Sequence, residues 1–217
     1  NCFAGENLYQ ANQFGFTSAT ISGYNEEVKK RIVHESLVRL VLHEVGHTLG
    51  LNHNFKSSYL HNNKTVHNKG ITEEMGLTGS VMEYPGINIA PPGTEQGEYY
   101  TTTPGPYDIW AIEFGYSTAL ENNELEESRL NTILSRSTSP SLAFGNDADD
   151  MRAPGKGIDP QAMIYDMSSD PISYASDRVE LSKYLLDDIV VKYSDRGASY
   201  QALRDAFAIL LREHSTA

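Results

Sequence analysis

The chain is poor in cysteine, in basic residues and in long apolar runs. Its one cysteine, Cys2, excludes an internal disulfide framework and any zinc site built from several thiolates. No apolar run approaches the roughly 20 residues that span a bilayer, so no transmembrane segment is expected. With 17 Lys and Arg against 29 Asp and Glu, the net charge of −12 repels phosphate backbones and argues against nucleic acid as a partner.

The remaining composition is that of a globular protein. Hydrophobic residues make up 39% and charged residues 21% of the 217 positions, which is enough for one sizeable core with a smaller appendage. No internal repeat is visible, which argues against a solenoid. The chain starts at Asn1 and shows no charged segment followed by an apolar one, so we expect a processed protein or part of a longer precursor.

Local patterns predict a mainly helical protein. Asn25 is a typical N-cap, and apolar residues then recur at helical spacing as far as Val45, which predicts one long helix over about 26–49. Gly50 follows, where a left-handed residue commonly ends a helix. Further helices are expected at 107–114 (closed by Gly115), 120–134, 171–193 and 199–211, with one short strand at 14–22 and mostly loop from 51 to 105.

The long helix carries a pair of histidines with metal-ligand spacing. Residues 43–47 read His-Glu-Val-Gly-His, so His43 and His47 stand one helical turn apart, about 40° from one another around the axis. After the turn that Gly50 allows, His53 can supply a third nitrogen. Three neutral imidazoles leave the fourth position of a tetrahedral zinc ion to water, which is typical of a catalytic site. Glu44 is placed to act as the general base for that water.

Residues 43–53 match the metzincin motif HExxHxxGxxH at every fixed position, and residues 80–84, Ser-Val-Met-Glu-Tyr, resemble the Met-turn that follows it. Residues 108–112 also resemble the start of the next helix in serralysins and matrixins. The resemblance implies that Met82 forms an apolar floor beneath the metal and that Tyr84 helps to stabilise the transition state. The chain is most similar to a family of large exported bacterial zinc-dependent metallopeptidases.

This resemblance implies a fold, an activity and a location. The expected fold is a mainly α, zincin-like core over residues 1–116, with a helical C-terminal subdomain over 117–217 packed on it. Most of the upstream sheet of metzincins would belong to the remaining N-terminal part of a longer precursor. The implied activity is that of a zinc endopeptidase acting on a protein or peptide substrate, and the implied location is exported: periplasmic, cell-surface or secreted.

Several alternatives remain open at this stage. The domain could be a zinc-stabilised binding module, or a catalytically vestigial fragment, although Glu44 favours an enzyme. Six aspartates lie in a glycine-containing loop and make a calcium site conceivable; they are Asp147, Asp149, Asp150, Asp159, Asp166 and Asp170. Glu73 or Glu74 could replace His53 as the third ligand if a helix formed there, but Gly70 and Gly76 argue against that helix.

The other histidines are not expected to be ligands. We interpret His61 and His67 as solvent-exposed loop residues, and helical rotation places His34 away from the face that carries His43. Asn54, directly after the third histidine, differs from the residue at that position in the better-known metzincin branches.

Overall fold

The computed structural model describes residues 4–150, 159–194, 196–197 and 199–216. Over these residues the chain forms helices and no strand, with one isolated bridge between Asp150 and Asp159. The α-helices are α1 (Ala4–Ile21), α2 (Glu26–Thr48), α3 (Lys69–Met75), α4 (Pro106–Tyr116), α5 (Asn123–Leu134), α6 (Pro171–Tyr193) and α7 (Tyr200–Thr216). Short 3-10 turns are η1 (Ser57–Leu60), η2 (Thr65–His67), η3 (Ser135–Thr138) and η4 (Pro140–Leu142). The predicted mainly helical fold is confirmed.

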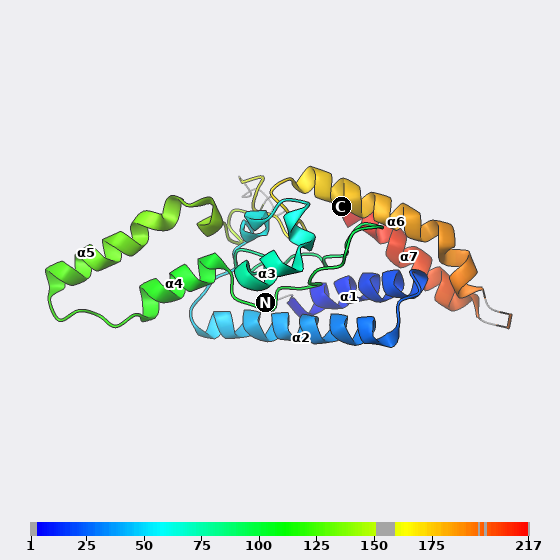
Figure 1. Ribbon diagram of the computed structural model, residues 1–217, viewed down its shortest axis with the longest axis horizontal. Helices are drawn as coiled ribbons and strands as arrows, with labels where there is room; N and C mark the ends of the chain where they lie inside the picture. Colours follow the sequence, from blue (N-terminus) through cyan, green and yellow to red (C-terminus); the bar gives the residue numbers. More distant parts are fainter. Residues whose placement is uncertain (1–3, 151–158, 195, 198, 217) are drawn as a thin grey trace.

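Helix α1 replaces the strand predicted at 14–22, so that prediction was wrong. Figure 1 shows α1 lying along α2 as one arm of a hairpin. The buried positions Phe14, Thr17, Ser18 and Ile21 are spaced by three and four residues, which is the pattern of one helix face. Two of the four, Thr17 and Ser18, are small polar residues. The helical spacing is therefore visible in the burial pattern but not in the pattern of hydrophobic residues.

The main core joins α1 and α2 to the C-terminal helices. Phe14, Ile32, Leu185 and Leu210 are buried together there, with segment 87–100 between the helices. This core takes residues from both sides of residue 116. The division into two subdomains at that residue stays a prediction.

The buried guanidinium of Arg178 contacts both the N-terminal and the C-terminal helices. Arg178 of α6 lies over the ring of Phe14, 4.5 Å from its centroid. It donates a hydrogen bond to the Ile87 carbonyl at 2.6 Å and forms an ion pair with Glu213 of α7. Because a buried charge needs both a counter-ion and hydrogen-bond acceptors, these partners fix where α6 and α7 meet α1.

Helix α2 has the ends that the sequence predicts. The Asn25 side chain accepts a hydrogen bond from the Val28 amide, and Gly50 follows the helix with a φ of 85°. A stripe of apolar side chains along this helix remains exposed: Val33, Leu37, Val41, Val45 and Leu49. The helix therefore buries one side against the core and leaves an apolar side uncovered.

The loop predicted at 51–105 contains one helix that sequence reasoning rejected. Helix α3 forms despite its glycines, because the Asn68 side chain accepts from the Ile71 amide and Gly76, with φ 83°, ends the helix. Gly70 lies in the first turn and is tolerated there. Similarly, α4 continues through Gly115 to Tyr116 rather than closing before it.

Helices α4 and α5 form a second hairpin that extends away from the body of the molecule (Figure 1). The Trp110 indole donates to the Ile133 carbonyl at 2.8 Å and ties the two helices together. The Tyr116 hydroxyl donates to the Leu49 carbonyl at the end of α2, which places this hairpin beside the C-terminal end of α2. None of the helices described is both long and apolar enough to cross a lipid bilayer.

Gly105→Ala is expected to destabilise the fold, whereas Gly115→Ala is not. A Cβ atom at residue 105 would lie 2.2 Å from the Gly79 carbonyl oxygen and 2.5 Å from that of Thr78, and backbone cannot move aside cheaply. Overpacking of this kind costs about 1–3 kcal/mol. A Cβ at residue 115 meets nothing within 4 Å, and alanine favours a helix by about 0.5–1 kcal/mol over glycine. Urea denaturation of both variants checks this, and equal midpoints would contradict the packing described.

Candidate metal centre

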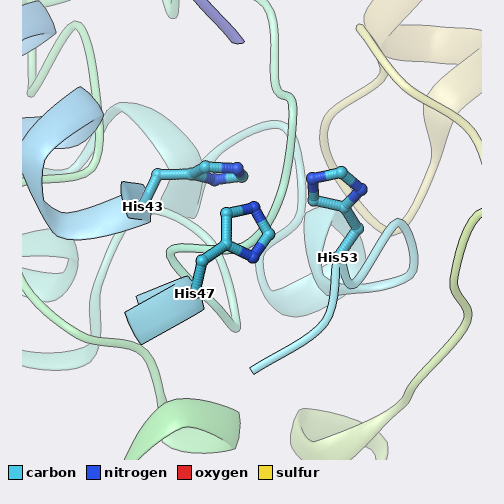
Figure 2. A group of neighbouring side chains, drawn as sticks. All are labelled: His43, His47 and His53. Carbon is cyan, nitrogen blue, oxygen red and sulfur yellow. The ribbon is translucent and has the colours of Figure 1, made fainter. Parts of the chain in front are cut away.

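The two histidines on α2 present their rings side by side. The ring centroids of His43 and His47 lie 4.8 Å apart, with the planes nearly perpendicular at 88°. His53 comes from the loop after α2, and Figure 2 shows all three imidazoles converging from the helix and the loop. One ligand atom from each of the three lies within 4.8 Å of the others, a spacing that a single metal ion can bridge.

In all three rings the Nδ1 atom lies within hydrogen-bond distance of an oxygen acceptor. The Nδ1 of His43 lies 2.9 Å from the Val81 carbonyl, and that of His47 lies 3.0 Å from the Leu51 carbonyl. The Nδ1 of His53 lies 2.9 Å and 3.0 Å from the two carboxylate oxygens of Asp147. Because each partner only accepts hydrogen bonds, Nδ1 must carry the proton, which leaves the Nε2 lone pair of each ring available.

The residues present therefore fit a zinc ion. The Nε2 of His43 is buried and has no hydrogen-bond partner among the described residues, which suits an atom that binds a metal. Burial and the nearby Arg39 charge lower the pKa of His43 to about 3, so the ring is the neutral form that coordination requires. The Nε2 of His53 lies 3.0 Å from the Tyr84 hydroxyl, a polar contact that a metal ion would replace.

The turn at residues 80–84 is anchored by a buried carboxylate. Asp108, in the first turn of α4, accepts hydrogen bonds from the Ser80 hydroxyl at 2.5 Å, the Val81 amide at 2.8 Å and the Gly105 amide at 2.9 Å. Burial raises the pKa of Asp108, and these three donors oppose that shift. The Val81 carbonyl in turn orients His43, so α4 supports the first ligand through the turn.

Met82 of this turn lies directly against α2. It is fully buried, and a Cβ atom at Gly46 would lie 2.4 Å from its sulfur. Gly46, between His43 and His47, therefore leaves room for the thioether beside the helix. The Met82 carbonyl also accepts from the Asn54 amide at 3.1 Å, so the same turn supports the segment that carries His53.

Tyr84 is held among aromatic and charged side chains. Its ring centroid lies 5.0 Å from that of His43 and 4.8 Å from that of His53. The Arg39 guanidinium lies over the ring at 5.6 Å, and the Tyr165 amide donates to the Tyr84 carbonyl at 2.9 Å. These contacts keep the phenol beside the imidazoles, where its hydroxyl can donate a hydrogen bond.

Glu83, between Met82 and Tyr84, points into the protein. It is 1% exposed and accepts from the Ser57 hydroxyl, the Ser58 amide and the Tyr84 amide. Burial, with the charge of Asp166, raises the pKa of Glu83 well above its ordinary value. Its contacts join the turn to η1, which makes Glu83 a structural residue of the turn.

The remaining candidates lie elsewhere. Glu44 is exposed on α2 directly after His43. His61 and His67 are buried, contrary to the expectation of exposed loop residues: His61 bonds the Gly76 carbonyl at 2.7 Å, and burial lowers the pKa of His67 to about 4. Neither joins the histidine group, and His34 is exposed away from it.

The alternative ligand sets do not assemble. Glu73 and Glu74 lie on the exposed side of α3 and are not part of the histidine group. Among the described residues, the six loop aspartates form no cluster of three potential ligands, so the calcium possibility has no support; residues 151–158 of that loop lie outside the described residues. Asp147 contacts His53 and Asp159 pairs with Lys56 at 2.9 Å.

Sequence reasoning missed the residues that support the ligands from a distance. Asp108 was noted only as part of a resemblance, and Asp147 only as a possible calcium ligand. Both act across long sequence separations, 27 residues to Val81 and 94 to His53, and no local pattern reveals such pairs.

A helix with two histidines one turn apart, a third from the following loop and a methionine turn beneath them define a zincin-type metal centre. Residues 25–217 match the family described as Met-zincin, and the chain therefore belongs to that family. This confirms the resemblance to metzincin-type zinc metallopeptidases. No curated protein and no solved structure matches the chain.

His43→Ala, His47→Ala and His53→Ala are each expected to abolish stoichiometric zinc binding, because each removes one of only three protein ligands. His34→Ala is the matched control, since His34 is exposed on the same helix and should keep one zinc per chain. Metal analysis after dialysis against a weak chelator measures this. Full zinc retention by the His53 variant would show that another residue supplies the third ligand.

Proposed function

We propose that this chain is the catalytic core of a zinc-dependent endopeptidase. The observation that carries the proposal is the set of three imidazoles whose Nδ1 atoms each lie beside an acceptor and which each offer one ligand nitrogen within 4.8 Å of the others. His43, His47 and His53 would hold the metal. When bound, zinc would polarise a peptide carbonyl and make water a better nucleophile at neutral pH.

The proposed roles of the other residues follow from their positions. Glu44 takes a proton from the attacking water and passes it to the leaving amine, and its exposure on α2 leaves the carboxylate accessible to substrate. The Tyr84 hydroxyl, 3.0 Å from His53 Nε2, donates a hydrogen bond to the carbonyl oxygen as negative charge develops on it. Met82 fills the space beneath the ligands and does no chemistry.

Glu44→Gln is expected to keep zinc and to lower kcat by about 100- to 10,000-fold, the usual contribution of a general base. The amide has nearly the same size but cannot take the proton. Zinc content and cleavage of a peptide library by the wild-type and variant enzymes, assayed side by side, provide the measurement. Comparable rates would remove Glu44 from the mechanism. Because a further N-terminal part is expected to contribute to the cleft, the assay uses the full-length mature protein, and a zinc-loaded full-length wild type with no activity on any peptide would favour a binding module.

Tyr84→Phe is expected to retain zinc and part of the activity, with a loss of about 2.7–4 kcal/mol of transition-state stabilisation at most. The ring contacts with His43 and His53 remain in this variant, so only the hydroxyl is tested. The change should appear in kcat rather than in KM, because the bond strengthens as charge develops. A rise in KM with unchanged kcat would assign Tyr84 to substrate binding.

Two further aspects of the proposal concern the cell and the whole gene product. Export and an additional N-terminal part that contributes to the substrate cleft stay predictions. The sequence of the full coding region, with fractionation of cells that express it, tests both.

A further inference from the structure

The third ligand differs from the other two in what orients it. Backbone carbonyls fix His43 and His47, and no side-chain substitution can remove those acceptors. The acceptor for His53 is the side chain of Asp147, at 2.9 Å and 3.0 Å. His53 also lies on a loop rather than on a helix, so its backbone restrains it less.

Asp147 is held in place by the residue that follows the ligand. Asn54 is fully buried; its side-chain oxygen accepts from the Gly145 amide at 3.2 Å, and its amide group donates to the Ala143 carbonyl at 3.0 Å. The Phe55 amide donates to the Gly145 carbonyl at 2.7 Å. Segment 143–145 therefore lies against residues 54–55, which brings Asp147 beside His53.

The turn that follows does not depend on the Asp147 side chain. The Asn146 carbonyl accepts from the Asp149 amide at 2.9 Å, the Asp149 carboxylate accepts from the Asn146 amide at 3.0 Å, and the Asn146 side chain accepts from the Ala148 amide at 2.9 Å. The carboxylate of Asp147 makes its described contacts with His53 alone and is largely exposed, at 68%. An exposed carboxylate whose contacts go to one ligand is available for a role in orienting that ligand.

We propose that Asp147 is a positioning residue that fixes the tautomer and the ring orientation of His53 for metal binding, an inference that rests on the proposed zinc site. The carboxylate accepts the Nδ1 proton, which directs the Nε2 lone pair towards the space between the three rings. Negative charge on the acceptor also makes the imidazole a stronger ligand. The Tyr84 hydroxyl, 3.0 Å from Nε2, can either donate to that nitrogen or accept from it, so Asp147 is the contact that selects the tautomer.

Zinc affinity is the first test. Asp147→Ala is expected to weaken zinc binding by about 10- to 100-fold, the usual effect of losing such a partner. Asp147→Asn keeps an acceptor oxygen without the charge and should recover part of that loss. Asp187→Ala, an exposed aspartate on α6, is the matched control and should bind zinc as the wild type does. Competition against a chromophoric zinc chelator at fixed pH gives all four dissociation constants.

The tautomer of His53 is the second test and needs neither metal nor activity. Long-range ¹H–¹⁵N NMR spectra of the zinc-free protein distinguish a protonated Nδ1 from a protonated Nε2 in each ring. We expect all three rings to be protonated on Nδ1 in the wild type. In Asp147→Ala only His53 should become a mixture, while His43 and His47 keep their backbone partners.

The outcomes separate this inference from the proposed function. Zinc binding that is lost in all three histidine variants but is within threefold of wild type in Asp147→Ala would overturn the role of Asp147 alone. An unchanged His53 tautomer in Asp147→Ala would do the same. Zinc binding that survives in the histidine variants would overturn the metal centre itself. Thermal unfolding of the zinc-free variants identifies any loss that comes from misfolding, and Asp147→Asn then serves as the decisive variant.

Discussion

The candidate site depends on one buried carboxylate, that of Asp108. It receives two donors from the turn at 80–84 and one from the start of α4, so these two segments meet at its two oxygen atoms. Leaving such buried donors unpaired would cost about 1–3 kcal/mol for each. Because the Val81 carbonyl orients His43 and the Met82 carbonyl supports the segment after His53, displacement of this turn would disturb His43 on the helix and His53 on the loop together.

Several polar and charged side chains are buried around the site. Arg39, Glu83 and Asp108 are each under 5% exposed, and each has hydrogen-bond or aromatic partners. Arg39 donates to the Glu83 carbonyl at 2.6 Å and lies over the Tyr84 ring, so one side chain links α2 to the turn. These hydrogen bonds restrain α2, the turn at 80–84 and η1 relative to one another, as a metal centre needs.

The sequence predicts the parts of this protein that local chemistry determines. The helix from Asn25 to Gly50 has its cap, its period and its terminating glycine within one segment, and the histidine spacing lies inside it. Helix α1 was not predicted, because Thr17 and Ser18 take buried positions on its inner face and conceal the period. Tertiary packing determines which polar residues are buried, and a single sequence does not show which helix will pack against them.

The supporting residues were harder still, since their partners are distant in the chain. Nothing in the local sequence indicates that Glu83 is buried, and only the structure shows its contact with η1. Likewise, Asn54 looked like a departure from a motif until its buried contacts with segment 143–145 gave it a structural role.

The separation between His53 and Asp147 also affects how the protein matures. Bringing together residues 94 positions apart costs about 4 kcal/mol in chain entropy, more than the roughly 1.5–3 kcal/mol of a charged hydrogen bond. The bond cannot close that loop alone and depends on the contacts of Asn54 and Phe55 with segment 143–145. During synthesis from the N-terminus, all three histidines are made by residue 53, whereas the carboxylate that contacts His53 follows 94 residues later and must then dock beside it.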